Sequence, residues 1–466
     1  MDESRRAVLV RAAGGAATLG AAALGIAPAI AQDRGRSRPA NGPAGNLGLD
    51  ATAFGLNPGS PDDQSAALGR AIVAAARRQA PLVLPPGRYR ASAVPLMDGT
   101  VLIGLGDQAR LVQAGDGPIL TAGGLKRLRL QSLILDGMAR RVADGRGLAE
   151  MEDTADAVID GCVLTAAGDT GLVMRRSGGE VTGCRFTDMG SSALFTLDAT
   201  GLAILDNVVA TCRNNGIQIW RSAAGEDRTI VRGNRVSDIH FDAGGTGQNG
   251  NGISVFRAGG VLIEGNVVRD CALTAIRNNS GANCQMIGNS CTRSGEMAIY
   301  SEFAFQGAII ANNVIDDAAT GISITNFDYG GRLAVCSGNL VRNTTRRPLP
   351  YTGKPGGGVG IHVEAEAAVA GNAVEGASDI GISAGWSYAM RNLAVTGNMV
   401  RGSPVGISVS IVPEVRNALI ANNVIAGATK GAVVGFRYEE AVTGDLTKAP
   451  DERASGIRVE GNAVGS

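Results

Sequence analysis

The 466-residue sequence predicts an all-β solenoid of short parallel strands, and three observations support this fold class. First, one phrase recurs almost to the end of the chain; its clearest copy is Val261–Val268 (VLIEGNVV). Second, the chain has 68 glycines and only 4% aromatic residues, which is typical of many turns around a core of small aliphatic side chains. Third, the regular unit of about 22 to 27 residues leaves no room for a helix beside its strands.

An asparagine marks the centre of the recurring phrase. Asn tolerates left-handed backbone, and its side-chain amide can bond to the equivalent Asn of the next coil, so we expect a turn at this position. Two earlier copies carry Cys162 and Cys184 there instead. The asparagines are Asn207, Asn234, Asn266, Asn289, Asn313, Asn339, Asn372, Asn398, Asn423 and Asn462.

Apolar residues recur three positions before and two positions after this asparagine, as Ile263 and Val268 do around Asn266. We expect both columns to point inward. A second phrase follows in most units, for example Gly216–Ile219 (GIQI) and Gly321–Ile324 (GISI). Its strict alternation predicts a strand with one buried face. Such a unit buries its apolar side only by stacking on its neighbours.

These repeats resemble the right-handed parallel β-helix repeat of the pectin-lyase-like superfamily over roughly residues 82–466. The resemblance implies a single-stranded right-handed parallel β-helix with an N-terminal capping helix. It implies almost nothing about the reaction, because one scaffold hosts many functions.

The N-terminus is predicted to be a targeting segment. Ser4–Leu9 (SRRAVL) resembles the twin-arginine export motif, although Val8 stands where the motif usually carries Phe, and Ala29–Ala31 fits a cleavage site. This predicts a periplasmic or secreted protein that meets the twin-arginine export machinery. The apolar run is too short and too glycine-rich for a stable membrane anchor. Together with the β-helix repeats, the signal resembles the twin-arginine-translocated uncharacterised repeat protein family, which implies a periplasmic location and leaves open whether a cofactor is bound.

Four regions are predicted: a signal peptide at 1–31, a linker at 32–48, an N-terminal cap at 49–99 and the repeats at 100–466. The cap is expected to hold a helix from an N-cap at Ser60 to about Arg78, with Leu68, Ile72 and Ala75 on its buried face. A net charge of zero excludes the basic surplus that nucleic-acid binding needs. Seven cysteines without a CxxC pair predict core or turn residues rather than a disulfide framework.

Insertions predict the working face, because in solenoids they cluster there. They flank the Gly-Ile strand on both sides, so its outward face is expected to be the floor of a groove. The insertions are Ser222–Arg228, Ser237–Gly250, Asn326–Arg332, Arg342–Val359, Gly385–Asn392 and Arg437–Ser455.

Five residues at this face are the candidates for catalysis: Arg277, Tyr300, Glu302, His362 and His240. Arg277 would hold a carboxylate, Tyr300 or His362 would carry protons, and Glu302 would be a second base. A solvated sheet face also carries such residues, so a purely structural role stays open for each. The serines of the same column are expected to be small spacers, since no base is recognisable beside them.

Aromatic and charged side chains on the same strands are the candidates for substrate binding, because aromatic rings stack on sugars and arginines pair with uronate carboxylates. No metal ligands are predicted. The candidates are Trp220, Arg221, Phe256, Arg257, Asn279, Glu364 and Trp386.

The predicted function is polysaccharide binding along the Gly-Ile strand, with lyase or C5-epimerase-like chemistry on uronate chains. The alternative is a non-catalytic carbohydrate-binding or cell-envelope structural protein on the same scaffold. A glycoside hydrolase fits poorly, because Glu302 and Glu364 would lie two coils, roughly 10 Å, apart.

Overall fold

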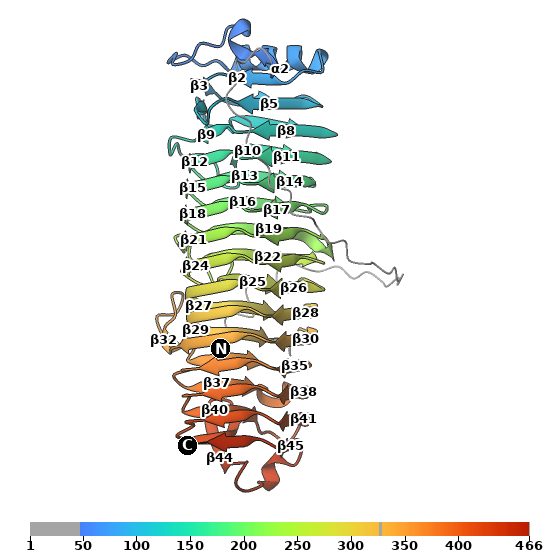
Figure 1. The fold of residues 1–466 in the computed structure, drawn as a ribbon, viewed down its shortest axis with the longest axis vertical. Coiled ribbons are helices and arrows are strands. Elements are labelled where there is room, and N and C mark those ends of the chain that lie inside the picture. The colour runs from blue at the N-terminus through green and yellow to red at the C-terminus, as the bar shows by residue number, and fades with distance from the viewer. Residues whose placement is uncertain (1–46, 326–328, 466) are drawn as a thin grey trace. The chain divides into compact units, whose positions relative to one another are not determined.

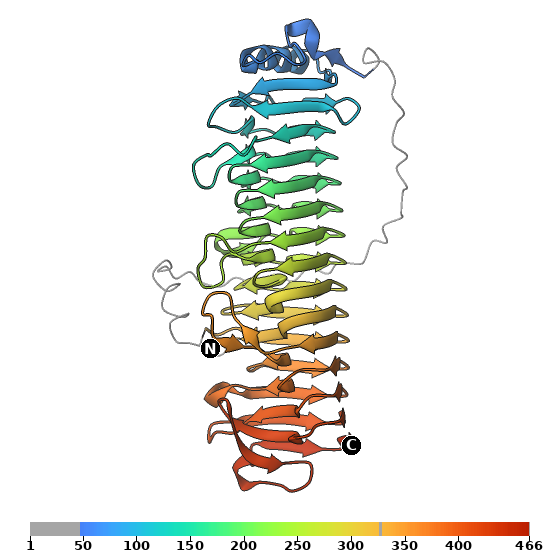
Figure 2. The ribbon, with the colours of Figure 1, turned by 90° about the vertical axis from the view of Figure 1, so that its left-hand side faces the viewer.

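The computed structural model describes residues 47–325 and 329–465, and in this part the chain is a parallel β-solenoid with a single α-helix. Its strands form a 16-stranded and a 28-stranded sheet with parallel pairing between coils, plus a small antiparallel pair. Figures 1 and 2 show the coils stacked one on another from α2 to β45. The predicted fold class is therefore confirmed. The segments predicted as signal peptide and linker lie outside the described residues, except for Leu47 and Gly48.

Each regular coil contributes one strand to the 16-stranded sheet and two strands to the 28-stranded sheet. In the 28-stranded sheet these strands lie in two separate rows. The 16-stranded sheet consists of β1 (Leu49–Asp50), β2 (Leu82–Leu84), β5 (Thr100–Gly104), β8 (Arg127–Gln131), β11 (Asp156–Asp160), β14 (Gly179–Thr182), β17 (Ala203–Leu205), β20 (Ile230–Arg232), β23 (Leu262–Glu264), β26 (Cys284–Ile287), β28 (Gln306–Ala311), β30 (Arg332–Ser337), β35 (Ala367–Ala370), β38 (Arg391–Thr396), β41 (Arg416–Ala421) and β45 (Ile457–Glu460).

The strands that follow the asparagine form the first row of the 28-stranded sheet. They include β12 (Val163–Ala167), β15 (Arg185–Met189), β18 (Val208–Cys212), β21 (Arg235–Ile239), β24 (Val267–Cys271), β31 (Leu340–Thr344), β36 (Ala373–Glu375), β39 (Met399–Arg401), β42 (Val424–Ala426) and β46 (Ala463–Gly465).

The strands with the Gly-Ile phrase, or its equivalent, form the second row. They include β4 (Val94–Pro95), β7 (Leu120–Gly123), β10 (Gly147–Glu152), β13 (Thr170–Arg175), β16 (Ser192–Leu197), β19 (Asn215–Glu226), β22 (Asn251–Gly259), β25 (Ile276–Asn279), β27 (Ser290–Glu302), β29 (Val314–Thr325), β34 (Val359–Val363), β37 (Ile380–Ala384), β40 (Val405–Ser410) and β43 (Gly431–Arg437). β27 and β29 span both rows, because they continue without a break from the asparagine to the Gly-Ile phrase.

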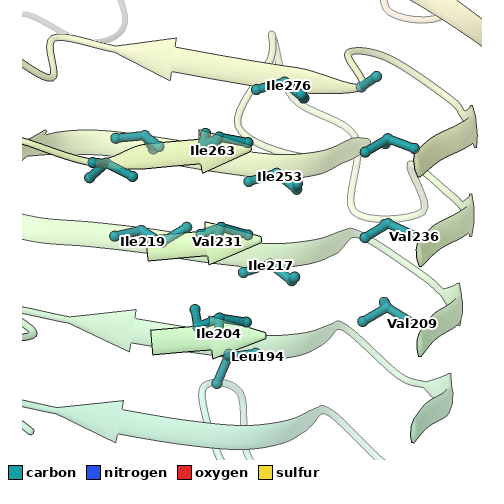
Figure 3. Packing of buried hydrophobic residues seen from close by; sticks show 14 of the residues in the cluster. Leu194, Ile204, Val209, Ile217, Ile219, Val231, Val236, Ile253, Ile263 and Ile276 are labelled. Carbon is teal, nitrogen blue, oxygen red and sulfur yellow. The ribbon is translucent and has the colours of Figure 1, made fainter. Parts of the chain in front are cut away.

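Stacked aliphatic side chains fill the inside of the coils. Ile263 and Val268 are fully buried, as predicted for the two columns beside the asparagine, and Ile253 buries its side chain from the Gly-Ile strand. Figure 3 shows these columns repeating from coil to coil. Because each unit buries its apolar side against the units before and after it, the repeat is stable only as a stack.

The recurring asparagines form a continuous ladder of side-chain amides. The backbone N–H and the Nδ2 of Asn234 both donate to Oδ1 of Asn266, at 2.9 and 3.0 Å. Asn266 Nδ2 also donates to the carbonyl of Val231 at 2.9 Å. The side-chain link repeats at each step from Asn207 to Asn462. The predicted bond between asparagines of successive coils is confirmed.

The predicted left-handed backbone is one residue out of place. The residue before the ladder asparagine adopts it, for example Gly265 with φ 62°, Asn312 with φ 57° and Asn422 with φ 56°. The reason is that the ladder asparagine turns its own N–H and side chain into the coil, so the preceding residue makes the turn.

The N-terminal cap contains α2 (Ser65–Arg77), and Leu68, Ile72 and Ala75 lie on its buried face as predicted. The predicted start at Ser60 is wrong. Asp63 forms a parallel bridge with Arg90, which holds this segment beside β3 (Gly87–Ala91), and its Oδ1 accepts from the backbone N–H of Ser65 at 2.9 Å. The helix therefore begins only after this bridge. No helix in the described residues is long and apolar enough to cross a membrane.

All seven cysteines are buried free thiols. Cys162 and Cys184, which continue the asparagine column, are both 1% exposed, and the backbone N–H of Cys184 donates to Oδ1 of Asn207 at 2.9 Å. A hydrogen bond with Cys162 and burial raise the pKa of Cys184. The pair therefore serves as core and turn filler, as expected from the sequence.

Candidate functional site

The outward side chains of the Gly-Ile strands lie in two columns, which we call the Gly-Ile face. Strand pairing aligns Ser254, Arg277, Tyr300, Ser323, His362, Ser383 and Ser408 in one column. It aligns Trp220, Phe256, Asn279, Glu302 and Thr325 in the other. Most of these side chains are buried although they point away from the coil interior.

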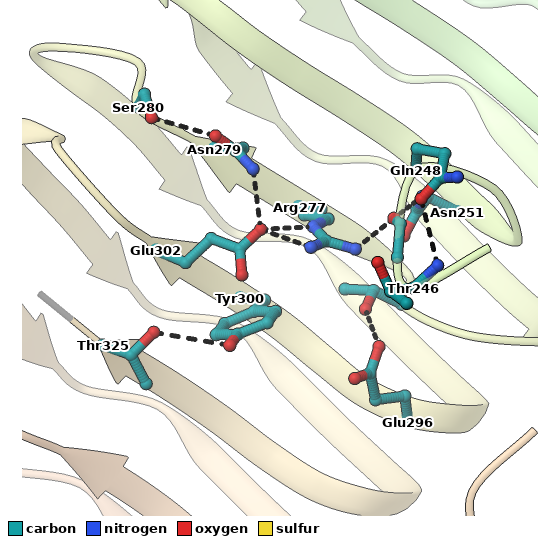
Figure 4. A network of polar contacts seen from close by, with 12 residues as sticks. Thr246, Gln248, Asn251, Arg277, Asn279, Ser280, Glu296, Tyr300, Glu302 and Thr325 are labelled. Carbon is teal, nitrogen blue, oxygen red and sulfur yellow. Dashed lines mark hydrogen bonds and ion pairs between the residues drawn. The ribbon is translucent and has the colours of Figure 1, made fainter. Parts of the chain in front are cut away.

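Arg277 and Glu302 form a buried ion pair in the middle of the face, with 8% and 4% of their side chains exposed. Arg277 Nε donates to Glu302 Oε1 at 2.7 Å, and its Nη2 donates to the same oxygen. Asn279 Nδ2 adds a third bond to this oxygen at 2.9 Å. Figure 4 shows Arg277 and Asn279 converging on Glu302. The structure therefore brings three of the predicted residues together, but the carboxylate that Arg277 holds belongs to this chain.

Tyr300 lies beside this pair, with its ring 5.4 Å from the guanidinium carbon of Arg277. Its hydroxyl accepts from Oγ1 of Thr325 at 3.4 Å. Burial, with smaller contributions from Glu302 and Glu296, raises the pKa of Tyr300. Burial alone would lower the pKa of Arg277, but the charges of Glu302 and Glu296 hold it above the usual range.

The insertion between β21 and β22 covers the ion pair. The carbonyl of Gly247 accepts from Nη1 of Arg277, and Asn251 Nδ2 donates to the same carbonyl at 2.9 Å. Gly247 has φ 136°, and a Cβ atom there would collide with the guanidinium group. This close approach of backbone to side chain explains the glycine.

His240 lies in the same insertion but on an exposed stretch. Its Nε2 is 3.0 Å from Asp238 Oδ1, and both side chains are about half exposed. Its backbone N–H donates to the carbonyl of Cys212. The contacts of His240 are therefore with Asp238 and Cys212 and not with the ion pair.

A second group of candidates surrounds His362, three coils beyond Arg277. His362 Nδ1 lies 3.1 Å from the hydroxyl of Ser383, its partner in the next coil. His362 Nε2 is buried without a hydrogen bond and is 4.0 Å from Glu364 Oε1. With about 4.8 Å between coils, the Cα atoms of Arg277 and His362 are roughly 14 Å apart. One sugar ring cannot touch both.

Aromatic rings border the His362 group. The ring of Trp386 meets that of His362 edge to face, with centroids 6.3 Å apart, and Tyr438 meets Trp386 at 5.8 Å. Trp386 is half-buried, whereas Tyr438 is 56% exposed. Tyr438 was missed in the sequence, although it lies in the insertion after β43 that the sequence marks as part of the working face.

A second aromatic cluster lies before the ion pair. Trp220 packs between Phe195 and Phe256, at 5.7 and 5.4 Å, and the guanidinium carbon of Arg257 lies 4.7 Å from the ring centroid of Phe256. Arg221 is near Asp198, at 4.0 Å. Trp220 Nε1 is buried without a hydrogen bond. Of the predicted binding residues, Asn279 joins the Arg277–Glu302 network, and the others lie in or beside two aromatic clusters on either side of that pair.

One prediction about the serine column is wrong. The sequence shows no base beside these serines, but the structure places the imidazole of His362 within hydrogen-bond distance of Ser383. The two residues are 21 positions apart in the chain, and only the register of β34 with β37 makes them neighbours. Glu296, which accepts from Oγ1 of Thr274 at 3.2 Å, was also missed.

The sequence also does not reveal a groove on the opposite, 16-stranded sheet. The groove has a volume of about 890 Å³, and its floor includes Ile309, Val335, Ala368 and Ala394. Because this floor is apolar, we place the candidate chemistry on the Gly-Ile face. Within residues 47–325 and 329–465, no three side chains of His, Cys, Asp or Glu come together to hold a metal ion.

The sequence matches the family described as right handed beta helix region, over residues 141–247 and 222–400, which together make up more than half of the chain. No curated protein sequence matches. Among solved structures, the N-terminal fragment of gene product 12 of bacteriophage phi29 is similar at 13% identity and a TM-score of 0.56, covering 90% of this chain and 71% of that one. A PL6 alginate lyase in complex with a trisaccharide is similar at 14% identity and a TM-score of 0.53, covering 89% of this chain and 95% of the lyase. At this identity the likeness shows the fold.

Proposed function

The chain belongs to the right-handed β-helix family, and on this premise we propose that it binds a polysaccharide along the Gly-Ile face. The two aromatic clusters support this proposal, because tryptophan and tyrosine rings present flat apolar surfaces on which sugar rings stack. The two clusters lie at either end of a line of polar side chains, and this arrangement suits an extended chain of sugars. The alginate lyase of similar fold was solved with a trisaccharide, and on this basis we propose a carbohydrate as the class of ligand for this chain.

We place the chemistry at His362. The observation that supports this choice is the place of His362 between two polar groups of the face: Nδ1 lies 3.1 Å from the hydroxyl of Ser383, and Nε2 lies 4.0 Å from a carboxylate oxygen of Glu364. An imidazole held in this way can take up and release a proton beside a bound sugar. Abstraction of the C5 proton of a uronate residue leads either to elimination, as in a lyase, or to reprotonation on the other face, as in an epimerase.

Arg277 has a different place in this proposal from the one the sequence suggests. Because it is three coils from His362 and holds Glu302, it contributes to the shape of the face rather than to the reacting sugar. Trp220, Arg221, Phe256 and Arg257 would bind a more distant part of the same polysaccharide.

The test is incubation of the mature protein with a panel of uronate polysaccharides. A lyase produces new unsaturated ends that absorb in the ultraviolet, whereas an epimerase exchanges the C5 proton with solvent. His362→Gln should lower either rate by about 10²–10⁴-fold, the usual contribution of a general acid–base group. Binding should survive this change and should weaken in Trp386→Ala. Unchanged activity in His362→Gln would reject the assignment.

A non-catalytic binding protein is the second candidate, and the Arg277 network favours it. Arg277, Glu302 and Asn279 satisfy one another, as in a structural ion pair. Tight binding of polysaccharide with neither unsaturated ends nor C5 exchange would support this candidate.

We further propose that the protein works in the periplasm or outside the cell. The predicted twin-arginine signal at residues 1–31 supports this location. Replacement of Arg5 and Arg6 by lysine should then leave the protein in the cytoplasm, and cell fractionation would detect this. Normal export of that variant would contradict the proposal.

A further inference from the structure

Ser383, His362 and Glu364 lie in the order of a nucleophile, a base and an orienting carboxylate. The hydroxyl of Ser383 is 3.1 Å from His362 Nδ1, and on the other side of the ring Nε2 is 4.0 Å from Glu364 Oε1. With the ring proton on Nε2, directed toward Glu364, Nδ1 is free to accept the proton of the serine. This relation of the three groups activates serine for attack on an acyl carbon.

The sheet geometry itself produces this arrangement. His362 and Ser383 are direct partners in the register of β34 with β37, so their side chains leave the same face one coil apart. Glu364 is two residues beyond His362, and its backbone N–H continues the pairing with the carbonyl of Ile324. Side chains two residues apart in a strand lie on the same face.

Burial increases along the three residues in the direction that such a reaction needs. Ser383 is half-buried and therefore open to a substrate, His362 is 9% exposed, and Glu364 is 1% exposed. The carboxylate is thus shielded from water, while the nucleophile stays accessible. The next residue along the column is Ser408, which is 4% exposed.

We propose that Ser383, His362 and Glu364 form a triad that removes small O-acyl groups from the sugar hydroxyls of the bound polysaccharide; the choice of a sugar ester rests on the proposed function. Ser383 Oγ attacks the acyl carbonyl carbon while its proton passes to His362. When the tetrahedral intermediate collapses, the bond from carbon to the sugar oxygen breaks, and His362 gives its proton to that oxygen. Water, deprotonated by His362, then releases the acyl group as a carboxylic acid and restores Ser383.

Glu364 acts through His362 as a positioning residue. Trp386, whose ring meets His362 edge to face, would stack on the sugar that carries the ester. The small side chains of Ser383 and Ser408 suit a short acyl group, such as acetyl, better than a long chain.

The test uses the full mature chain with p-nitrophenyl acetate and with a fluorophosphonate probe that labels activated serines. The wild type should hydrolyse the ester and take up one probe per chain, on the peptide that contains Ser383. Ser383→Ala should lose labelling and fall to the rate of buffer. Ser254→Ala, a serine of the same column four coils before His362, should label as the wild type does.

Two further variants separate catalysis from structure. His362→Gln should lower hydrolysis by about 10²–10⁴-fold. Glu364→Gln should slow it, and Glu364→Asp should restore part of the rate, because the carboxylate and not the packing volume is needed. Far-UV circular dichroism should show the wild-type fold in each variant.

The outcomes distinguish this proposal from the polysaccharide proposal. Labelling at Ser383 without polysaccharide binding would keep the triad and reject its sugar substrate. Binding, C5 exchange or unsaturated ends without labelling would overturn the triad and keep the proposed function. Equal labelling of the wild type and Ser383→Ala would also overturn the triad.

Discussion

Arg277 shows how a single residue changes meaning between sequence and structure. In the sequence it is a cation on an outward face, available to a uronate. In the fold it is 6% exposed and is engaged by Glu302 and by the carbonyl of Gly247. A buried pair of this kind contributes little net stability compared with apolar residues, but it is costly to break, because the remaining charge stays buried.

Arg277→Ala should therefore destabilise the protein by roughly 3–5 kcal/mol, while the double variant Arg277→Met with Glu302→Leu should cost much less. Urea unfolding followed by far-UV circular dichroism measures both. If the single variant is no less stable than the double variant, then leaving Glu302 without its partner has no cost, and the pair is not a buried structural ion pair. A single variant that stays fully folded but loses activity would return Arg277 to the catalytic group.

At the scale of the elements, the asparagine ladder joins successive coils at the turn between the 16-stranded sheet and the first row of the 28-stranded sheet. Nδ2 of Asn289, an interior rung, donates to Oδ1 of Asn313 and to the carbonyl of Ile263, and its Oδ1 accepts from the N–H and the Nδ2 of Asn266. Its side chain therefore satisfies groups in the coils on both sides. Because these groups are buried, each would cost free energy if left without a partner. The ladder thus fixes the register of successive strands and also contributes to the stability of the stack.

Asn289→Ala should lower the free energy of unfolding by about 1–3 kcal/mol for each buried group that it leaves unsatisfied. Asn462→Ala, at the last rung, should cost less. Asn462 is half-buried, and within the described residues its Nδ2 donates to the carbonyl of Ile420 alone, whereas Nδ2 of Asn289 also donates to the next asparagine of the ladder. Thermal unfolding of the two variants gives the comparison. Equal losses at the two positions would show that the ladder adds nothing beyond local turn geometry.

At the scale of the whole molecule, the solenoid buries ionisable groups all along its length. Burial raises the pKa of Cys284, Cys291 and Cys336 to about 12, and burial together with Asp50 raises that of Tyr89 to about 12. In the unfolded chain these groups ionise from about pH 8.5 for cysteine and about pH 10 for tyrosine. Ionisation above these pH values therefore lowers the free energy of the unfolded state, whereas the folded state keeps these groups protonated up to a higher pH.

Stability should consequently be constant near neutral pH and should fall as pH rises from about 8.5 toward 12. Urea midpoints at pH 7, 9 and 11 test this expectation. The double variant Cys291→Ala with Cys336→Ala should show a smaller fall, since two of the thiols are absent. A midpoint that does not change up to pH 11 would contradict the burial of these groups.

The sequence by itself determines the fold. In every unit the apolar residues equivalent to Ile263 and Val268 stand at fixed distances from the asparagine, and these residues are buried only when the units stack as coils. It also identifies the face that carries polar and aromatic residues. The start of α2 and the position of the left-handed residue were missed, because the bridge of Asp63 to Arg90 and the inward turn of the asparagine are set by neighbouring coils.

Only the tertiary structure decides which side chains of the face meet. Arg277 pairs with Glu302, and His362 pairs with Ser383, because parallel pairing of successive coils puts their side chains on the same face one coil apart. Residues that are 21 or 25 positions apart in the chain become direct neighbours in this way. Spacing along the sequence aligns these strands, but it does not reveal which side chains bond to one another. That choice depends on side-chain conformation and on loops such as Ser237–Gly250, whose Gly247 carbonyl accepts from Arg277.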